Sequence, residues 1–154
     1  PGQFASNLKV TIKTDKSEIS GVRVLGPLRD YTQVEISKTD AYKFGLNPPV
    51  RESGNLKGSE DITIIGDNEI TLKECTIIAT RHIHASKEDL VKYNLDASKK
   101  YKVKINGEKG GIINNVSIKV SDKAFFEMHL DTDDGNGHLL KCGDTATIIG
   151  EDNE

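Results

Sequence analysis

Two histidines one residue apart, His82 and His84 in the segment R-H-I-H, are the side chains of this sequence best suited to chemistry. In a β-strand, residues i and i+2 point to the same face, so the two imidazoles would project side by side. Neutral imidazole is a zinc ligand, and two ligands on one strand with a third from elsewhere is a common zinc arrangement. The spacing predicts part of a metal site; the alternative is two surface imidazoles on an edge strand.

Two further residues lie at corresponding places in neighbouring segments. Three segments each consist of a strand, a turn, a second strand and a short third strand. The third strand carries Glu35 in the first segment, the histidine pair in the second and His129 in the last. With symmetric stacking, Glu35 and His129 would reach the same place. The alternatives are a solvent-facing glutamate and an ordinary core or edge histidine.

Arg29 follows G-P-L in a predicted turn. Its planar guanidinium could hold an oxyanion through two parallel hydrogen bonds. A solvated turn arginine is the alternative.

The elements that must position these residues are mostly strands. Alternating apolar residues between turn residues predict strands at 9–13, 22–25, 32–36, 62–65, 69–72, 76–80, 82–84, 101–105, 111–113, 116–120, 125–130 and 145–149. Two short helices are predicted, Lys38–Phe44 after the N-cap Ser37 and Lys87–Tyr93 after the N-cap Ser86. Each helix follows a third strand, which indicates an internal repeat with a period near 48 residues.

The predicted fold class is therefore all-β with short capping helices, arranged as two small β-barrels related by the internal repeat. We expect the first barrel, with one helix, over residues 1–79 and the second, with its capping helices, over residues 80–154.

Composition excludes several classes of function. The net charge is −3 and acidic and basic residues are interspersed, so we expect no nucleic-acid partner. No apolar run has transmembrane length, so we expect no membrane partner. Neither Cys75 nor Cys142 belongs to a C-x-x-C pair. We expect Cys75 to be a buried apolar residue and Cys142 to be a free thiol. Such cysteines fit a reducing compartment.

Four motifs, in this order along nearly the whole sequence, resemble the PduL-type phosphate propanoyltransferases, or phosphotransacylases. They are G-V-R-V-L-G-P-L-R-x-x-T-Q-V-E-I-S, P-P-V-R-E-S-G-N-L-x-G-S, I-I-A-T-R-H-I-H-A-S and V-S-D-x-x-x-x-E-M-H-L-D-T-D. The resemblance implies paired β-barrels with a two-zinc site between them. It also implies exchange of acyl-CoA (propanoyl-CoA or acetyl-CoA) and phosphate for acyl phosphate and CoA. A homo-oligomer is expected, in the cytoplasm or the lumen of a bacterial microcompartment for propanediol degradation.

The resemblance assigns roles to individual residues. His82, His84 and His129 match the three-histidine zinc site, and Glu35 matches the carboxylate ligand of the other zinc. Arg29 matches the arginine that holds phosphate. The positions expected to line the CoA pocket are Arg23, Leu25 and Asn136, and Gln3 matches a glutamine near the site.

The sequence departs from the family pattern at one important point. The family's earlier R-H-V-H-L segment, whose two histidines complete the second zinc site, is not in this sequence. We therefore expect an N-terminal segment to be missing, one zinc rather than two in this chain, and little activity from the chain alone. That segment or a second protomer would be the missing partner. The alternative is a non-catalytic metal-binding or structural β-barrel protein derived from the family.

Overall fold

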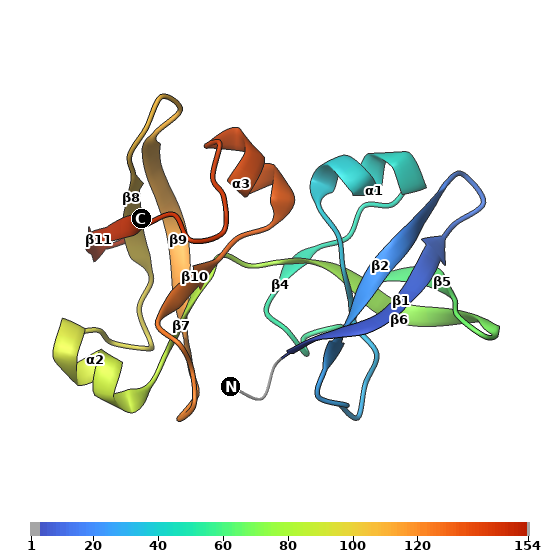
Figure 1. The fold of residues 1–154 in the computed structure, drawn as a ribbon, viewed down its shortest axis with the longest axis horizontal. Coiled ribbons are helices and arrows are strands. Elements are labelled where there is room, and N and C mark those ends of the chain that lie inside the picture. The colour runs from blue at the N-terminus through green and yellow to red at the C-terminus, as the bar shows by residue number, and fades with distance from the viewer. Residues whose placement is uncertain (1–3, 154) are drawn as a thin grey trace. The chain divides into compact units, whose positions relative to one another are not determined.

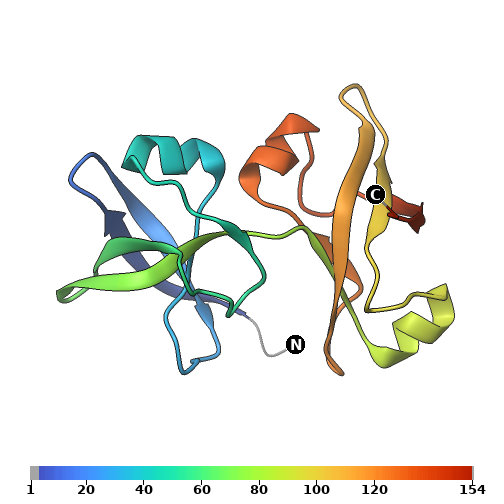
Figure 2. The same cartoon turned by 180° about the vertical axis from the view of Figure 1, so that it is seen from behind.

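A computed structural model of the chain describes residues 4–153 (Figures 1 and 2). The fold divides into two compact units, Pro1–Ala79 and Thr80–Glu154. Most elements are strands, and three short helices accompany them. The predicted all-β class with short helices is confirmed. None of the helices in the described part has more than seven residues, so none could cross a membrane.

The first unit is built on one sheet. Its strands are β1 (Phe4–Lys13), β2 (Glu18–Gly26), β3 (Val34–Glu35), β4 (Val50–Arg51), β5 (Glu60–Ile65) and β6 (Glu69–Ala79). The hydrogen-bonded order is β2-β1-β5-β6-β3, and β4 also pairs with β6. β3 and β4 both run parallel to β6, whereas the hairpins β1–β2 and β5–β6 are antiparallel.

Helix α1 (Lys38–Phe44) completes the core of the first unit. Ser37 caps it, because the Ser37 side chain accepts a hydrogen bond from the backbone N–H of Asp40. Gly45 ends it in the left-handed conformation that glycine tolerates best. The helix buries Ala41 and Phe44 against the apolar side chains of the sheet.

The second unit holds the other sheet. Its strands are β7 (His82–Ala85), β8 (Tyr101–Ile105), β9 (Gly111–Val120), β10 (Glu127–His129) and β11 (Ala146–Glu151), in the order β10-β7-β9-β8-β11. Its helices are α2 (Lys87–Tyr93) and α3 (Thr132–Gly137). Ser86 and Asp89 form a capping box at the start of α2. The core consists of the inward-facing side chains of β7, β8 and β9.

Neither sheet closes into a barrel through hydrogen bonds among residues 4–153, which corrects the prediction of two barrels. Strands that pair with a single neighbour are β2, β3 and β4 in the first unit and β10 and β11 in the second. A barrel needs a continuous ladder around its circumference. Because β3 has two residues and β10 has three, each offers little ladder to a further strand.

The predicted internal repeat is not confirmed. β3 and β7 do share a local plan, since each runs parallel to a long strand and leads into a serine-capped helix of seven residues. β10, however, runs antiparallel to β7 itself. His129 therefore does not hold the place in its sheet that Glu35 holds in the other.

Candidate functional site

Strands β7 and β10 bring three histidines together on one face of the second sheet. His82 and His84 alternate with the buried Ile83 on β7, and His129 lies directly opposite His82 on β10. The distances between ring centroids are 4.9 Å for His82–His84, 5.1 Å for His82–His129 and 4.3 Å for His84–His129. One ring nitrogen from each residue lies within 4.8 Å of the other two. All three side chains are half-buried.

The tautomer of His82 suits metal binding. Its Nδ1 lies 2.8 Å from the carbonyl oxygen of Thr80, and because that oxygen only accepts, Nδ1 carries the proton. Nε2 therefore acts as an acceptor, and it lies 3.0 Å from Nε2 of His84, which donates to it. A backbone carbonyl that orients an imidazole in this way is the usual support of a metal-binding histidine.

A carboxylate contacts the third histidine. Oε1 of Glu127, which lies opposite His84 in the ladder, is 3.0 Å from Nε2 of His129. A proton on this Nε2 leaves Nδ1 of His129 with its lone pair. A metal would bind through Nδ1, or through Nε2 once the metal replaces the contact with Glu127.

The surroundings keep His84 neutral. Its pKa is lowered to about 4, first because the ring is withdrawn from water, and then because His129, His82 and Lys119 would repel a positive charge on it. Lys119 lies opposite His84 on β9. The negative charge of Glu127 acts in the other direction and is outweighed. Metal binding needs the neutral ring, so protons at pH 7 do not compete with a metal for His84.

In the metal-free protein we expect the His84 ring to stay neutral as the pH falls from 7 to 5. Its folded-state pKa lies below the ordinary value of 6.5, so between these values the unfolded chain takes up a proton that the folded chain does not. Through this residue, the free energy of unfolding should decrease as the pH falls from 6.5 towards 4. NMR titration of the ring protons measures this, and a midpoint near 6.5 would contradict it.

A network of hydrogen bonds in the first unit includes two other predicted site residues, Arg29 and Glu35. Nη1 of Arg29 donates to the Tyr31 hydroxyl at 2.7 Å and to Oγ of Ser53 at 3.2 Å. Nε2 of Gln33 donates to the same Oγ at 3.0 Å and to Oε1 of Glu35 at 2.6 Å. Gln33 and Ser53 therefore link Arg29 to Glu35. We call Arg29, Gln33, Glu35 and Ser53 the Arg29 network.

The residues predicted to contact CoA lie on exposed positions. Arg23 and Leu25 are two positions apart on β2, so they share one face of the strand, and both are exposed. Asn136 is exposed on α3 in the second unit. Gln3 lies outside the described residues. The roles of these four residues stay predictions.

Several site residues were not predicted. Gln33 stands two residues before Glu35 within the predicted strand 32–36, and Ser53 lies in the motif P-P-V-R-E-S-G, so local signals existed for both. The contact of Arg81 with Asp134, described below, joins residues 53 positions apart and leaves no local signal.

Three imidazoles, one with its tautomer fixed by a carbonyl oxygen and one kept neutral, fit zinc as a ligand set. A search of the described residues for three or more histidine, cysteine or carboxylate side chains close enough to hold one ion finds His82, His84 and His129. Glu35 lies in the other unit.

Comparison with known proteins gives one answer along almost all of the chain. The phosphate propanoyltransferase family matches residues 1–141. A phosphate propanoyltransferase of Thermotoga maritima is 45% identical over 151 residues, which are 97% of this chain and 72% of that protein. One from Priestia megaterium is 46% identical over 149 residues, 96% of this chain and 69% of that protein. One from Rhodopseudomonas palustris is 41% identical over 149 residues, which are 96% of this chain and 66% of that protein. The chain therefore belongs to the phosphate propanoyltransferase family and is a transferase.

Proposed function

We propose that the protein interconverts an acyl-CoA and phosphate with an acyl phosphate and CoA, and that propanoyl-CoA or acetyl-CoA is the acyl donor. The observation that carries this proposal is the family match over residues 1–141. The three-histidine face of β7 and β10 and the Arg29 network supply the groups that such a reaction needs.

We propose that His82, His84 and His129 hold a zinc ion and that Glu35 contributes a carboxylate to a second one. A bound zinc would supply Lewis acidity toward the thioester carbonyl and a soft partner for the CoA thiolate. The three imidazoles would bind in their neutral form, and the carbonyl of Thr80 holds the proton of His82 on Nδ1, so that Nε2 is its ligand atom.

Arg29 is the proposed phosphate-binding residue. Both hydrogen bonds that Arg29 donates within residues 4–153 use Nη1, and the edge formed by Nε and Nη2 has the geometry to donate two parallel hydrogen bonds to phosphate. The Tyr31 hydroxyl and Ser53 hold the side chain in place before phosphate binds. This placement lowers the entropy cost of bringing phosphate to the thioester.

In the proposed reaction, a phosphate oxygen attacks the thioester carbonyl carbon, the carbon–sulfur bond breaks, and the thiolate leaves with the bonding electrons. No side chain of the protein forms a covalent intermediate. Burial raises the pKa of the Cys75 thiol, which opposes formation of a thiolate nucleophile. Arg23, Leu25 and Asn136 are proposed to bind CoA.

We expect thiol release from propanoyl-CoA only when phosphate is present, with one acyl phosphate formed for each thiol, slowly from this chain alone and faster from a version that also carries the R-H-V-H-L segment. A thiol reagent measures the CoA, and hydroxylamine trapping measures the acyl phosphate. The alternative is a metal-binding protein without transferase activity, which would hold zinc without releasing thiol. Thiol release that is independent of phosphate would indicate a hydrolase and would also contradict the proposal.

A further inference from the structure

The guanidinium of Arg81, the residue before His82, donates hydrogen bonds to protein oxygens through each of its three nitrogens. Nε donates to Oδ2 of Asp134 at 2.6 Å, Nη2 donates to Oδ1 at 2.7 Å, and Nη1 donates to the carbonyl oxygen of Asn114 at 3.1 Å. From this geometry we infer that Arg81 is a positioning residue that fixes α3 to β7 and so holds His129 and Asn136 in place. The inference rests on the proposed function for what those two residues do.

Arg81 is itself anchored to the centre of the sheet. Its carbonyl oxygen accepts hydrogen bonds from the backbone N–H of Ser117 at 3.0 Å and from the Ser117 hydroxyl at 3.2 Å. Its Nη1 reaches the backbone of Asn114 on the same strand, β9. β9 lies in the middle of the sheet, so whatever Arg81 binds is held against a fixed strand.

Helix α3 has little stability of its own. It has six residues, T-D-D-G-N-G, and two of them are glycines, each costing about 1 kcal/mol relative to alanine in a helix. None of its residues is buried. A helix of this length does not form alone in water, so contacts with the rest of the unit must hold it. The paired hydrogen bonds from Arg81 to Asp134 provide such contacts, and the Asp131 cap adds a local one.

The ion pair also lies next to the metal ligands. β7 and β10 pair His82 with His129, and from that point the chain continues through Asp131, the N-cap, into α3. On the other strand, Arg81 directly precedes His82. The contact of Arg81 with Asp134 therefore joins the two segments just past the His82–His129 pair. The Asp134 and Arg81 side chains are 22% and 36% exposed, so water screens the pair less than a fully exposed one.

The alternative is that Arg81 binds a substrate phosphate, as proposed for Arg29. The two roles predict opposite results for Asp134→Ala. If Arg81 binds an anion, removing the carboxylate frees the guanidinium, and substrate should bind more tightly. If Arg81 positions α3, Asp134→Ala and Arg81→Ala should cause the same loss.

We expect Arg81→Ala and Asp134→Ala each to weaken zinc affinity about tenfold, as is usual when a group that orients a metal ligand is lost. The double variant should have the same zinc affinity as either single variant, because both remove one interaction. The Michaelis constant for propanoyl-CoA should rise, because Asn136 lies on α3, while that for phosphate stays near its original value. Arg81→Lys should not restore zinc affinity, because an ammonium lacks the fork that binds both Asp134 oxygens and Asn114.

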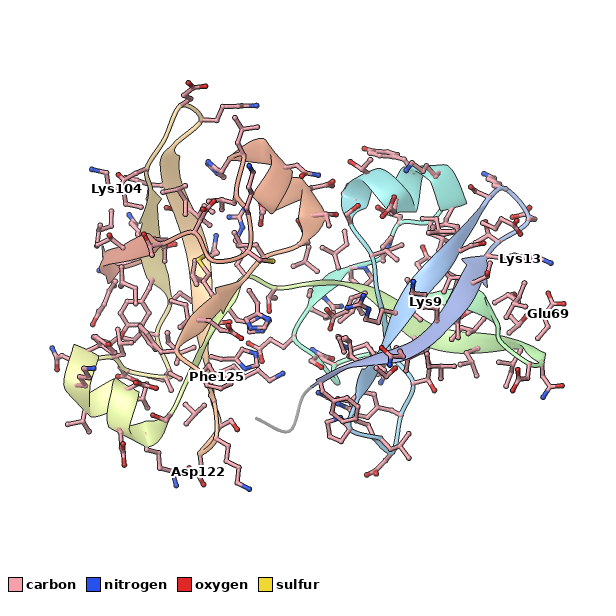
Figure 3. The ribbon with its side chains drawn as sticks, in the orientation of Figure 1. Lys9, Lys13, Glu69, Lys104, Asp122 and Phe125 are labelled. Atoms are coloured by element: carbon pink, nitrogen blue, oxygen red, sulfur yellow. The ribbon has the colours of Figure 1, made fainter. Side chains whose placement is uncertain are left out.

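Lys13→Ala is the matched control. It removes an ion pair with Glu69 at 3.0 Å in the first unit (Figure 3) and should leave both constants unchanged. Hydrogen exchange on the metal-free protein tests the positioning role without relying on activity. Amides of residues 132–137 should exchange faster in Arg81→Ala and Asp134→Ala, while those of β8 and β9 stay protected.

Unchanged exchange over 132–137, or tighter substrate binding in Asp134→Ala, would overturn the inference. If the unmodified protein bound no zinc, the proposed metal site would fail, and the exchange experiment would still decide the role of Arg81.

Discussion

Replacing His84 by alanine should lower zinc affinity at least about a hundredfold, and His82→Ala and His129→Ala should do the same. Structural zinc sites in zinc-finger peptides have apparent binding free energies of about 10–16 kcal/mol, so the loss of one of a few ligands costs several kcal/mol. The effect should be large at His84 because this ring is already neutral at pH 7 and loses no affinity to protons. Elemental analysis after dialysis against a limited zinc concentration measures the stoichiometry.

His138→Ala is the matched control for the metal site. His138 also lies in the second unit, but its Nδ1 contacts the backbone carbonyl of Lys109 and it is not a member of the three-histidine group. This variant should keep one equivalent of zinc. Full zinc content in His84→Ala, or an equal loss in His138→Ala, would show that the ion binds elsewhere. Cobalt substitution adds a spectroscopic measure of the ligand geometry.

The helices α1 and α2 were predicted residue for residue. Their boundaries depend on local chemistry, namely the serine side chains that accept hydrogen bonds at the start and the left-handed residues Gly45 and Asn94 at the end. All of these interactions join residues less than six positions apart. Such signals are visible in a sequence because no distant partner decides them.

Two long strands were predicted as broken strands, and the reason is not local. The sequence predicted separate strands at 111–113 and 116–120, but β9 continues from one to the other, with Asn115 at φ 61°. The backbone N–H of Asn115 donates to the Asp152 carboxylate, 37 residues away, at 2.7 Å. Likewise β6 continues through Glu74 at φ 49°, whose N–H donates to Asp61. A residue with positive φ inside a strand cannot be told from a turn residue by sequence, because the acceptor that holds its N–H is distant in the chain.

The same distinction holds for the candidate site. Strand alternation was enough to place His82 and His84 on one face, because that relation spans two residues. The approach of His129 depended on the pairing of β10 with β7, and the repeat from which it was predicted is not confirmed. The Arg29 network and the contact of Arg81 with Asp134 depend on side chains that meet only after the sheets form. β4, which carries the chain to Ser53, has two residues and was not predicted.

Arg29→Lys should lower kcat/KM for phosphate about 10- to 100-fold and change the Michaelis constant for propanoyl-CoA much less. Loss of charge-assisted hydrogen bonds costs about 1.5–3 kcal/mol. Lysine keeps the positive charge, but its single ammonium cannot contact Tyr31 and Ser53 while donating two parallel hydrogen bonds to phosphate. Steady-state kinetics with each substrate varied in turn separates the two constants.

Two further variants test this explanation. Ser53→Ala removes a neutral hydrogen-bond partner of Arg29 and of Gln33. It should lower kcat/KM for phosphate, by a smaller factor than Arg29→Lys. Arg51→Lys is the matched control, because Arg51 lies nearby on β4 and its side chain contacts only the carbonyl oxygen of Val50 among the hydrogen bonds of the described chain. If Arg29→Lys instead raised the Michaelis constant for propanoyl-CoA and spared that for phosphate, Arg29 would bind CoA, and Arg23 would be the residue to test for phosphate.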